Sequence, residues 1–213
     1  MKNSKGFTLV EVLATLIVLG VVSTMVMPKI FDYINSSRDN IYVQDAKKMI
    51  SLAQYNMGAS STDIEKPNDG EIVIFTLNYL AGNDFRNPPN GGSYMMDASF
   101  VAVTYSLAED KYYFAGMLVE KIDDKGLNGV RLSTEESINN SKYKDLISGF
   151  SDDELRYVET PSNGSGTLIS TKYITDQLGS IEPWSNLINK KAVVRAYHDK
   201  KAIEYIVEKN GNL

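Results

Sequence analysis

The stretch KNSKGFTLVEVLATLIVLGVVSTMVMP, residues 2–28, decides the fold of this chain. Between Phe7 and Met27 the only ionisable residue is Glu11. This apolar run of about 21 residues is long enough, at the helical rise, to cross a hydrocarbon layer. Two lysines precede the run and none lies within it. We therefore expect the N-terminus to stay in the cytoplasm and the remainder of the chain to face outward.

Two common kinds of N-terminal segment fit this run incompletely. A cleavable secretory signal has a shorter apolar core and a small-residue cleavage site, whereas this run ends in Met25-Val26-Met27-Pro28. A plain membrane anchor explains the length but not Glu11. A carboxylate in lipid is costly unless it is paired, so it usually marks a function with a specific partner.

The sequence Lys5-Gly6-Phe7-Thr8-Leu9-Val10-Glu11 resembles the processing site of class III prepilins, the precursors of type IV pilins (here type IVa-like) and pseudopilins. The resemblance implies that prepilin peptidase cuts after Gly6 and that Phe7, the new N-terminal residue, is N-methylated. Glu11 occupies the place of the family's glutamate, the fifth residue of the mature chain. The new α-ammonium and the Glu11 carboxylate of a neighbouring subunit can then neutralise each other in an apolar environment.

The same resemblance implies an α+β pilin fold, in which a long N-terminal helix packs on a C-terminal antiparallel β-sheet domain. The expected division is a leader at 1–6, a hydrophobic transmembrane and polymerisation helix at 7–28, an amphipathic continuation at 29–58 and a globular head at 59–213. Gly20 and Pro28 bracket a segment that loses helical structure in assembled pili of this family, so we expect it to melt on polymerisation. A simple proline kink is the alternative.

The helical pattern continues to about Met57. The apolar stripe Tyr42, Ala46, Met49, Ala53 and Met57 recurs at steps of three and four and predicts a face docked on the head. Gly58 is the expected stop, which gives a helix of roughly 75 Å. A soluble globular protein rarely needs such a helix, whereas a polymer does.

Several shorter patterns predict elements of the head. Residues 71–80 fit a strand or a short helix, and residues 100–107 with 112–120 fit a hairpin. Capping boxes at Ser133–Glu136 and Ser151–Glu154 predict a helix running toward Ile147 and a second, shorter helix. Residues 160–167 read as a linker and 168–188 are ambiguous, because Pro183 prevents one continuous helix. Residues 192–197 and 202–207 form a second predicted hairpin.

The amino-acid composition disfavours some classes of function. Asp and Glu number 27 against 22 Lys and Arg, a net charge of −5, so generic nucleic-acid binding is disfavoured. Basic residues of the last hairpin (Lys190, Lys191, Arg195, Lys200, Lys201 and Lys209) could form a DNA-binding or adhesive surface, but they lack interleaved aromatics and fit a solvated face better. There is no cysteine, so no disulfide holds the C-terminal region.

Catalysis and metal binding find little support. The one histidine, His198, lies at a predicted turn with no second histidine to complete a zinc site. The acidic clusters Asp123-Asp124 and Asp152–Glu154 could supply oxygen ligands to calcium, but neither matches an EF-hand loop. We therefore expect no enzymatic activity and no cofactor, with calcium as an open alternative.

The expected function is that of a structural subunit of a type IV pilus-like filament that serves adhesion, motility and surface colonisation. Its implied partners are prepilin peptidase, the pilus assembly platform, and other pilin subunits in a homopolymer with minor pilins. The precursor is expected in the cytoplasmic membrane as a single-pass protein, and the assembled form on the cell surface. A minor pilin acting as an adhesin or DNA-binding module, and a pseudopilin of a type II secretion or competence system, are the alternatives.

Overall fold

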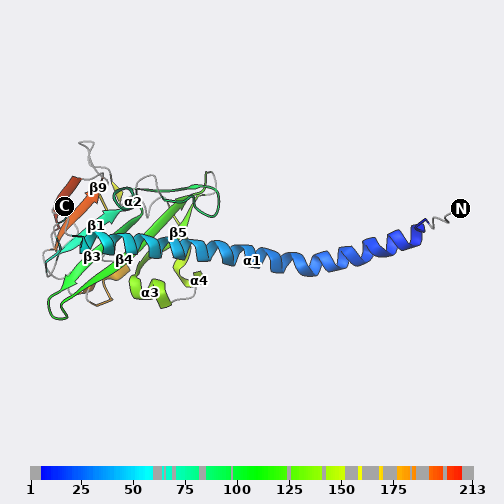
Figure 1. The fold of residues 1–213 in the computed structure, drawn as a ribbon, viewed down its shortest axis with the longest axis horizontal. Coiled ribbons are helices and arrows are strands. Elements are labelled where there is room, and N and C mark those ends of the chain that lie inside the picture. The colour runs from blue at the N-terminus through cyan, green and yellow to red at the C-terminus, as the bar shows by residue number, and fades with distance from the viewer. Residues whose placement is uncertain are drawn as a thin grey trace. The chain divides into compact units, whose positions relative to one another are not determined.

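In a computed structural model of the protein, the N-terminal sequence forms one helix, α1 (Leu9–Gly58), of 50 residues (Figure 1). The structure describes residues 6–59, 64, 66–68, 71–81, 85–96, 98–123, 126–140, 143–151, 158–159, 168–169, 177–182, 184–185, 192–198 and 201–207. The chain divides into two compact units, Met1–Arg38 and Asp39–Leu213, and α1 contributes residues to both.

Helix α1 is unbroken at both Gly20 and Pro28. Proline has no backbone N–H, so the carbonyl of Thr24 receives no helical hydrogen bond from residue 28. The predicted melting concerns the filament and stays a prediction. This helix is the one in the described part of the chain that is long and apolar enough to cross a membrane, by length and composition.

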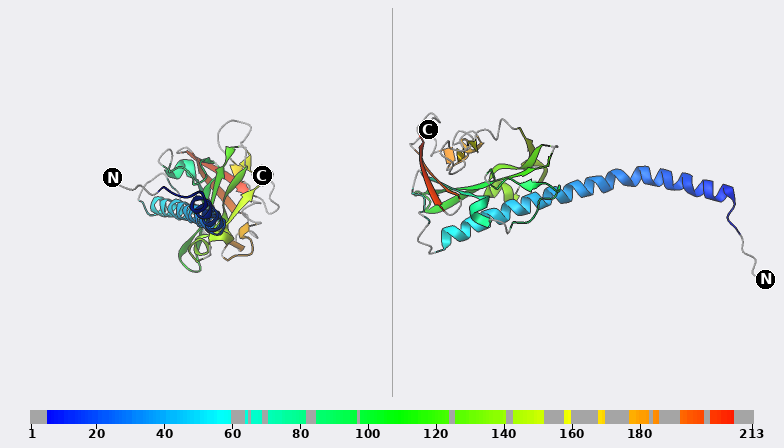
Figure 2. Two further views of the ribbon diagram at one scale, coloured as in Figure 1. Left: turned by 90° about the vertical axis from the view of Figure 1, so that its right-hand side faces the viewer. Right: turned by 90° about the horizontal axis from the view of Figure 1, so that it is seen from above.

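Within the second unit, the part of α1 from residue 39 to 58 lies on one face of a β-sheet (Figure 2). The predicted stripe from Tyr42 to Met57 is buried there, with each of its five side chains at most 5% exposed. On the same part of the helix, Gln44, Lys48 and Ser51 are exposed. The prediction of a docked amphipathic face is therefore confirmed.

The sheet has eight strands in the order β10-β9-β1-β3-β4-β5-β6, with β2 paired to β4. Its pairs are antiparallel except β1–β9, which is parallel. The strands are β1 (Ile72–Thr76), β2 (Ser93–Tyr94), β3 (Phe100–Ser106), β4 (Lys111–Lys121), β5 (Leu127–Thr134), β6 (Ile147–Phe150), β9 (Ala192–His198) and β10 (Lys201–Val207). A separate pair joins β7 (Val158–Glu159) to β8 (Leu168–Ile169). The predicted α+β architecture, a long helix on a mainly antiparallel sheet, is confirmed.

The two faces of the sheet carry two hydrophobic cores. In β1, Val73 and Phe75 pack with the core under α1, whereas Ile72 and Ile74 belong to the core on the other face. This alternation follows from the period of two along a strand. The second core includes Leu178 and Trp184, from the segment that covers the face opposite α1 (Figure 2).

Both predicted hairpins are present. Strands β3 and β4 pair from Phe100↔Met117 to Ser106↔Lys111, and β9 and β10 pair from Ala192↔Val207 to His198↔Lys201. Residues 71–80, which fit either a strand or a helix, contain β1 followed by the short helix α2 (Leu77–Ala81).

The predicted helix from Ser133 toward Ile147 is wrong in both its start and its end. Ser133 lies in β5, opposite Gly116, and its hydroxyl donates to the carbonyl of Arg131. The cap is Thr134, whose hydroxyl accepts a hydrogen bond from the N–H of Ser137 at 3.2 Å. Helix α3 (Glu135–Asn140) is short, a second short helix α4 (Tyr143–Leu146) follows, and Ile147 begins β6. Pairing of β5 with β4 and β6 overrides the local capping signal.

Two other expectations fall largely outside the described residues. The second capping box, apart from Ser151, and the linker at 160–167 lie there. In the ambiguous stretch 168–188, the described residues form β8 and helical turns at 177–178 and 184–185.

A buried carboxylate on α1 fastens the segment 85–94 to the helix. Asp45 is 1% exposed, forms an ion pair with Arg86, and accepts a hydrogen bond from the Tyr94 hydroxyl at 2.7 Å. Burial, followed by the hydrogen bond to Asp45, raises the pKa of Tyr94 above its ordinary value. Arg86 also donates to the carbonyl of Ile41 at 3.2 Å.

A second buried carboxylate, Glu120 on β4, secures the same segment from the sheet side. It is 0% exposed and accepts hydrogen bonds from the Tyr42 hydroxyl, from the Asn90 amide at 3.2 Å and from the N–H of Gly92 at 3.1 Å. A buried carboxyl group is tolerated inside a protein only when it is well hydrogen-bonded.

Candidate functional site

The N-terminal end of α1 is capped by three hydrogen bonds between Thr8 and Glu11. The Glu11 Oε2 atom accepts from the backbone N–H and from the hydroxyl of Thr8, both at 2.8 Å. In return, the Thr8 Oγ1 atom accepts from the N–H of Glu11 at 3.3 Å. This is a capping box, which satisfies backbone donors that have no partner at a helix start. The helix accordingly begins at Leu9, two residues after the predicted start at Phe7.

The predicted scissile bond lies just before this cap. Residues 6–8 are not helical, and the side chain of Phe7 is 87% exposed. A Cβ placed on Gly6 would have no atom within 4 Å. The structure therefore imposes no steric need for glycine at position 6.

The first unit is uncovered, and its surface from Phe7 to Met27 is almost entirely apolar. Every described residue from 6 to 38 is exposed. The large apolar side chains among them include Leu9, Val10, Leu13, Leu16, Ile17, Val18, Leu19, Met25, Phe31 and Tyr33. A contiguous apolar surface of this size on a protein marks a membrane or protein interface.

Two threonines within this surface form hydrogen bonds to their own helix. The hydroxyls of Thr15 and Thr24 donate to the carbonyls of Val12 and Val21, each at 2.8 Å. Such bonds let a hydroxyl enter lipid or a protein interior without leaving an unpaired donor.

Glu11 differs from these hydroxyls because only one of its two carboxylate oxygens accepts hydrogen bonds from the described residues. Both bonds from Thr8 end on Oε2, and within the described residues no hydrogen bond reaches the other oxygen, Oε1. An ionised carboxylate offers about four acceptor positions over its two oxygens. The arrangement holds the carboxylate in place and leaves one oxygen for an external donor.

The predicted site residues are thus distributed along the chain rather than gathered. Glu11 lies four residues after Phe7, which precedes the helix, whereas Gly20 and Pro28 lie further along α1. Thr8 was overlooked as a site residue, although the T-x-x-E pattern of residues 8–11 is visible in the sequence.

The weaker candidates for chemistry stay as predictions. Asp124 and the cluster 152–154 fall outside the described residues, as do the side chains of the last hairpin with His198. The described part of the chain contains no group of three or more His, Cys, Asp or Glu residues that could hold a metal ion.

Comparison with known proteins identifies the N-terminal segment. The family described as the prokaryotic N-terminal methylation motif matches residues 1–27. Neither the curated proteins nor the solved structures include a match to the chain. Residues 1–27 therefore carry the class III signal of type IV pilins, and the chain has the N-terminal segment of a type IV pilin-like or pseudopilin precursor.

Proposed function

We propose that this protein is a structural subunit of a type IV pilus-like filament. It is made as a membrane-inserted precursor, cut by prepilin peptidase between Gly6 and Phe7, methylated on Phe7, and polymerised through its N-terminal helix. The observation that carries the proposal is Glu11, the single ionisable residue of the exposed apolar run from Phe7 to Met27, held by Thr8 with one oxygen left for a partner.

The assembly mechanism follows from the cost of charge in an apolar environment. Hydrolysis of the bond after Gly6 leaves a carboxylate on the leader and an α-ammonium on Phe7. Either the ammonium or the Glu11 carboxylate alone is costly to bury in lipid or protein. Pairing the ammonium of one subunit with the Glu11 Oε1 atom of the next offsets much of that cost and fixes the axial register between neighbours.

The capping box contributes to this pairing by limiting where the carboxylate can go. A free glutamate side chain samples many rotamers, and ordering it on assembly costs free energy. Because Thr8 already holds Oε2, less of that entropy remains to be lost when a neighbour's ammonium binds Oε1. Thr8 is in this sense a positioning residue for Glu11.

In this proposal the second unit lies on the outside of the filament. The second unit carries its own two cores and a net acidic sequence composition, which suit a head displayed on the filament surface. The proposed activity is assembly, with no substrate turned over.

Mass spectrometry of the mature N-terminus tests the processing step. When the chain is expressed beside a prepilin peptidase and assembly platform, we expect the mature protein to begin at a methylated Phe7. Gly6→Ala should remain at precursor mass, and because position 6 has open space, loss of folding cannot explain that result. Native filaments whose subunits still begin at Met1 would contradict the proposal.

Substitution of Glu11 tests the pairing step separately. Glu11→Gln keeps an acceptor for Thr8 but removes the charge, so we expect normal membrane insertion and processing with a strong loss of filaments. Thr15→Ala, which removes another polar group of the same helix, is the matched control and should assemble normally. Normal filament yield from Glu11→Gln would refute the role of charge pairing.

The motif at residues 1–27 is shared by pilins and pseudopilins, so a second role remains in view. A minor pilin with an adhesive or DNA-binding head, or a pseudopilin of a secretion or competence system, would use the same assembly step. Abundance separates these roles. A filament composed mostly of this chain makes it the major subunit, whereas filaments that persist after its deletion assign it a minor role.

A further inference from the structure

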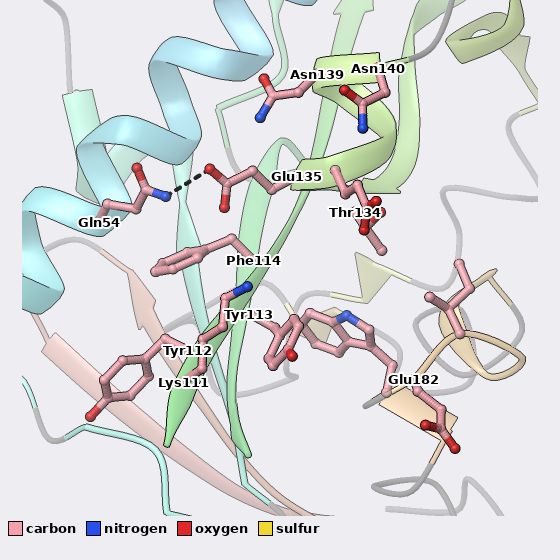
Figure 3. Close-up of a pocket in the computed structure, with 13 residues that line it drawn as sticks. Gln54, Lys111, Tyr112, Tyr113, Phe114, Thr134, Glu135, Asn139, Asn140 and Glu182 are labelled. Carbon is pink, nitrogen blue, oxygen red and sulfur yellow. Dashed lines mark hydrogen bonds between the residues drawn. The ribbon is translucent and has the colours of Figure 1, made fainter. Parts of the chain in front are cut away.

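The second unit contains a pocket of about 540 Å³ beside the start of β4 and helix α3 (Figure 3). This volume is in the range of sites that bind small molecules or peptide side chains. Its lining includes Lys111, Tyr113, Glu135, Glu136, Glu182 and Trp184, and the other lining side chains are drawn in Figure 3.

The lining has an excess of negative charge. Three carboxylates, Glu135, Glu136 and Glu182, face one ammonium, that of Lys111, for a formal charge of −2. Glu135 is oriented by the amide of Gln54, which donates to its Oε1 atom at 2.9 Å (Figure 3). The described residues provide no ion pair to any of the three glutamates.

Tyr113 lines the same pocket. Its hydroxyl donates to Glu109, and this hydrogen bond, then burial and the charges of Glu109 and Glu136, raise the pKa of Tyr113 above its ordinary value. The Lys111 ammonium lies 4.9 Å from the centre of the Tyr113 ring. The pocket thus already accommodates one ammonium group against an aromatic face, as a cation–π pair requires.

The donor set fits an organic cation rather than a metal ion. Among the described residues, no three carboxylates converge closely enough to hold a metal. Separated carboxylates and the amides of Asn139 and Asn140 can instead share the several N–H donors of an ammonium or guanidinium. An aliphatic stem can lie against Ile181 and the aromatic side chains.

The backbone beside the pocket favours a peptide as the bearer of this cation. Strand β4 pairs with β5 only from Ala115 onward, whereas its residues Lys111–Phe114 pair with β3 alone. Within the described residues, this short edge of β4 therefore has no strand partner. An extended peptide can add to such an edge through main-chain hydrogen bonds while one side chain enters the adjoining pocket.

We propose that this pocket binds an extended peptide segment that presents a lysine or arginine side chain. The peptide lies along the edge of β4 at Lys111–Phe114, and its cationic end is received by Glu136 and Glu182. None of the pocket residues is one of the N-terminal assembly residues. Peptide binding can therefore be measured and refuted without reference to filament formation.

The test uses the full chain in detergent micelles and the fluorescence of Trp184, the one tryptophan of the chain. The probes are acetyl-Thr-Lys-Thr-amide, the same peptide with norleucine in place of lysine, and the same peptide with glutamate there. We expect saturable binding of the lysine peptide with a dissociation constant of about 0.1–1 mM. Binding should weaken as salt rises, because the carboxylates and the cation are screened.

Two variants and a control make the test specific. Glu136→Gln and Glu182→Gln remove exposed carboxylates and should each weaken the lysine peptide about five- to tenfold. Asp145→Asn removes an exposed carboxylate on α4 outside the pocket and should leave binding unchanged. Equal binding of the norleucine peptide, unchanged binding by both Glu variants, or no saturation by about 10 mM lysine peptide would overturn the proposal.

Discussion

Removing Arg86 should destabilise the head, because it leaves the charge of Asp45 buried without its ion-pair partner. Asp45 is 1% exposed on the docked face of α1, whereas Arg86 is 48% exposed. In Arg86→Ala, the Tyr94 hydroxyl remains as a hydrogen-bond donor to the carboxylate at 2.7 Å. The segment 85–94 also loses the contact of Arg86 with the carbonyl of Ile41.

The size of the effect follows from these environments. Loss of one partner of a fully buried ion pair costs about 3–5 kcal/mol. Solvent screening of the half-exposed guanidinium and the retained bond from Tyr94 reduce this figure, so we expect Arg86→Ala to lower the free energy of unfolding by about 2–3 kcal/mol. Asp45→Asn in the same chain removes the stranded charge and keeps an acceptor for Tyr94. The double variant should therefore be more stable than Arg86→Ala alone, by about 1–2 kcal/mol.

Urea unfolding of the full chain in detergent micelles measures these differences. Trp184 is 2% exposed in the core opposite α1, so its fluorescence reports unfolding of the head rather than changes in the micelle-bound helix. The four proteins of the cycle give a coupling energy between the two positions. An Arg86→Ala protein within about 0.5 kcal/mol of the wild type, or strictly additive effects in the double variant, would refute the assignment of Asp45 as a buried charge dependent on Arg86.

Three further outcomes follow from the structure. The folded state holds the pKa of Tyr94 above its ordinary value. The free energy of unfolding should therefore be unaffected by this group below about pH 10 and fall by about 1.4 kcal/mol per pH unit above it. Urea titrations above that pH should show a smaller fall for Tyr94→Phe than for the wild type, and the same fall as the wild type for Tyr55→Phe, which changes an exposed tyrosine. Thr8→Val removes the cap hydroxyl and should reduce filament yield in electron micrographs, whereas Thr8→Ser should assemble normally; equal yields from both would rule out the positioning role. A Cβ on Gly92 would overlap the backbone carbonyl of Lys121, so Gly92→Ala should lower the urea midpoint by an amount corresponding to about 1–3 kcal/mol, and an unchanged midpoint would show that this turn relaxes freely.

The features that the sequence predicted are those whose signals are local or periodic. The apolar run, the motif from Lys5 to Glu11 and the docking stripe of α1 each depend on spacings within a few helical turns. The two hairpins depend on adjacent strands joined by short turns. The Thr8 cap belongs to the same class, since its partner is three residues away, and a search for T-x-x-E would have found it.

The features that sequence reasoning missed depend on contacts between distant segments. Strands β5 and β6 and the parallel pair β1–β9 exist because of neighbours in the sheet, and their own residues carry weak local signals. Ser133 shows the conflict directly, because its capping pattern is real but the strand ladder with Gly116 takes precedence. A local preference worth about 1 kcal/mol is readily outweighed by such pairing.

The burial of the two carboxylates, Asp45 and Glu120, could not be predicted from the sequence either. Asp45 follows the exposed Gln44 on α1 and has the sequence appearance of a solvent-facing position, yet it is 1% exposed. Its partner Tyr94 is 49 residues away, and Tyr42 is 78 residues from Glu120. No spacing rule connects such positions, so only the tertiary structure shows that these charges are satisfied.

This contrast also bears on why one helix can serve the proposed function. In the first unit, the side-chain hydrogen bonds of Thr8, Thr15 and Thr24 go to residues three positions away, so they survive any change of surroundings. A segment with such internally satisfied groups can pass from lipid into a protein interior without breaking a polar contact. Glu11 is the exception, because one of its oxygens still requires a donor that its own helix does not supply. In the proposed filament a neighbouring subunit supplies that donor, which gives the apolar run from Phe7 to Met27 a single position at which to register against its neighbour.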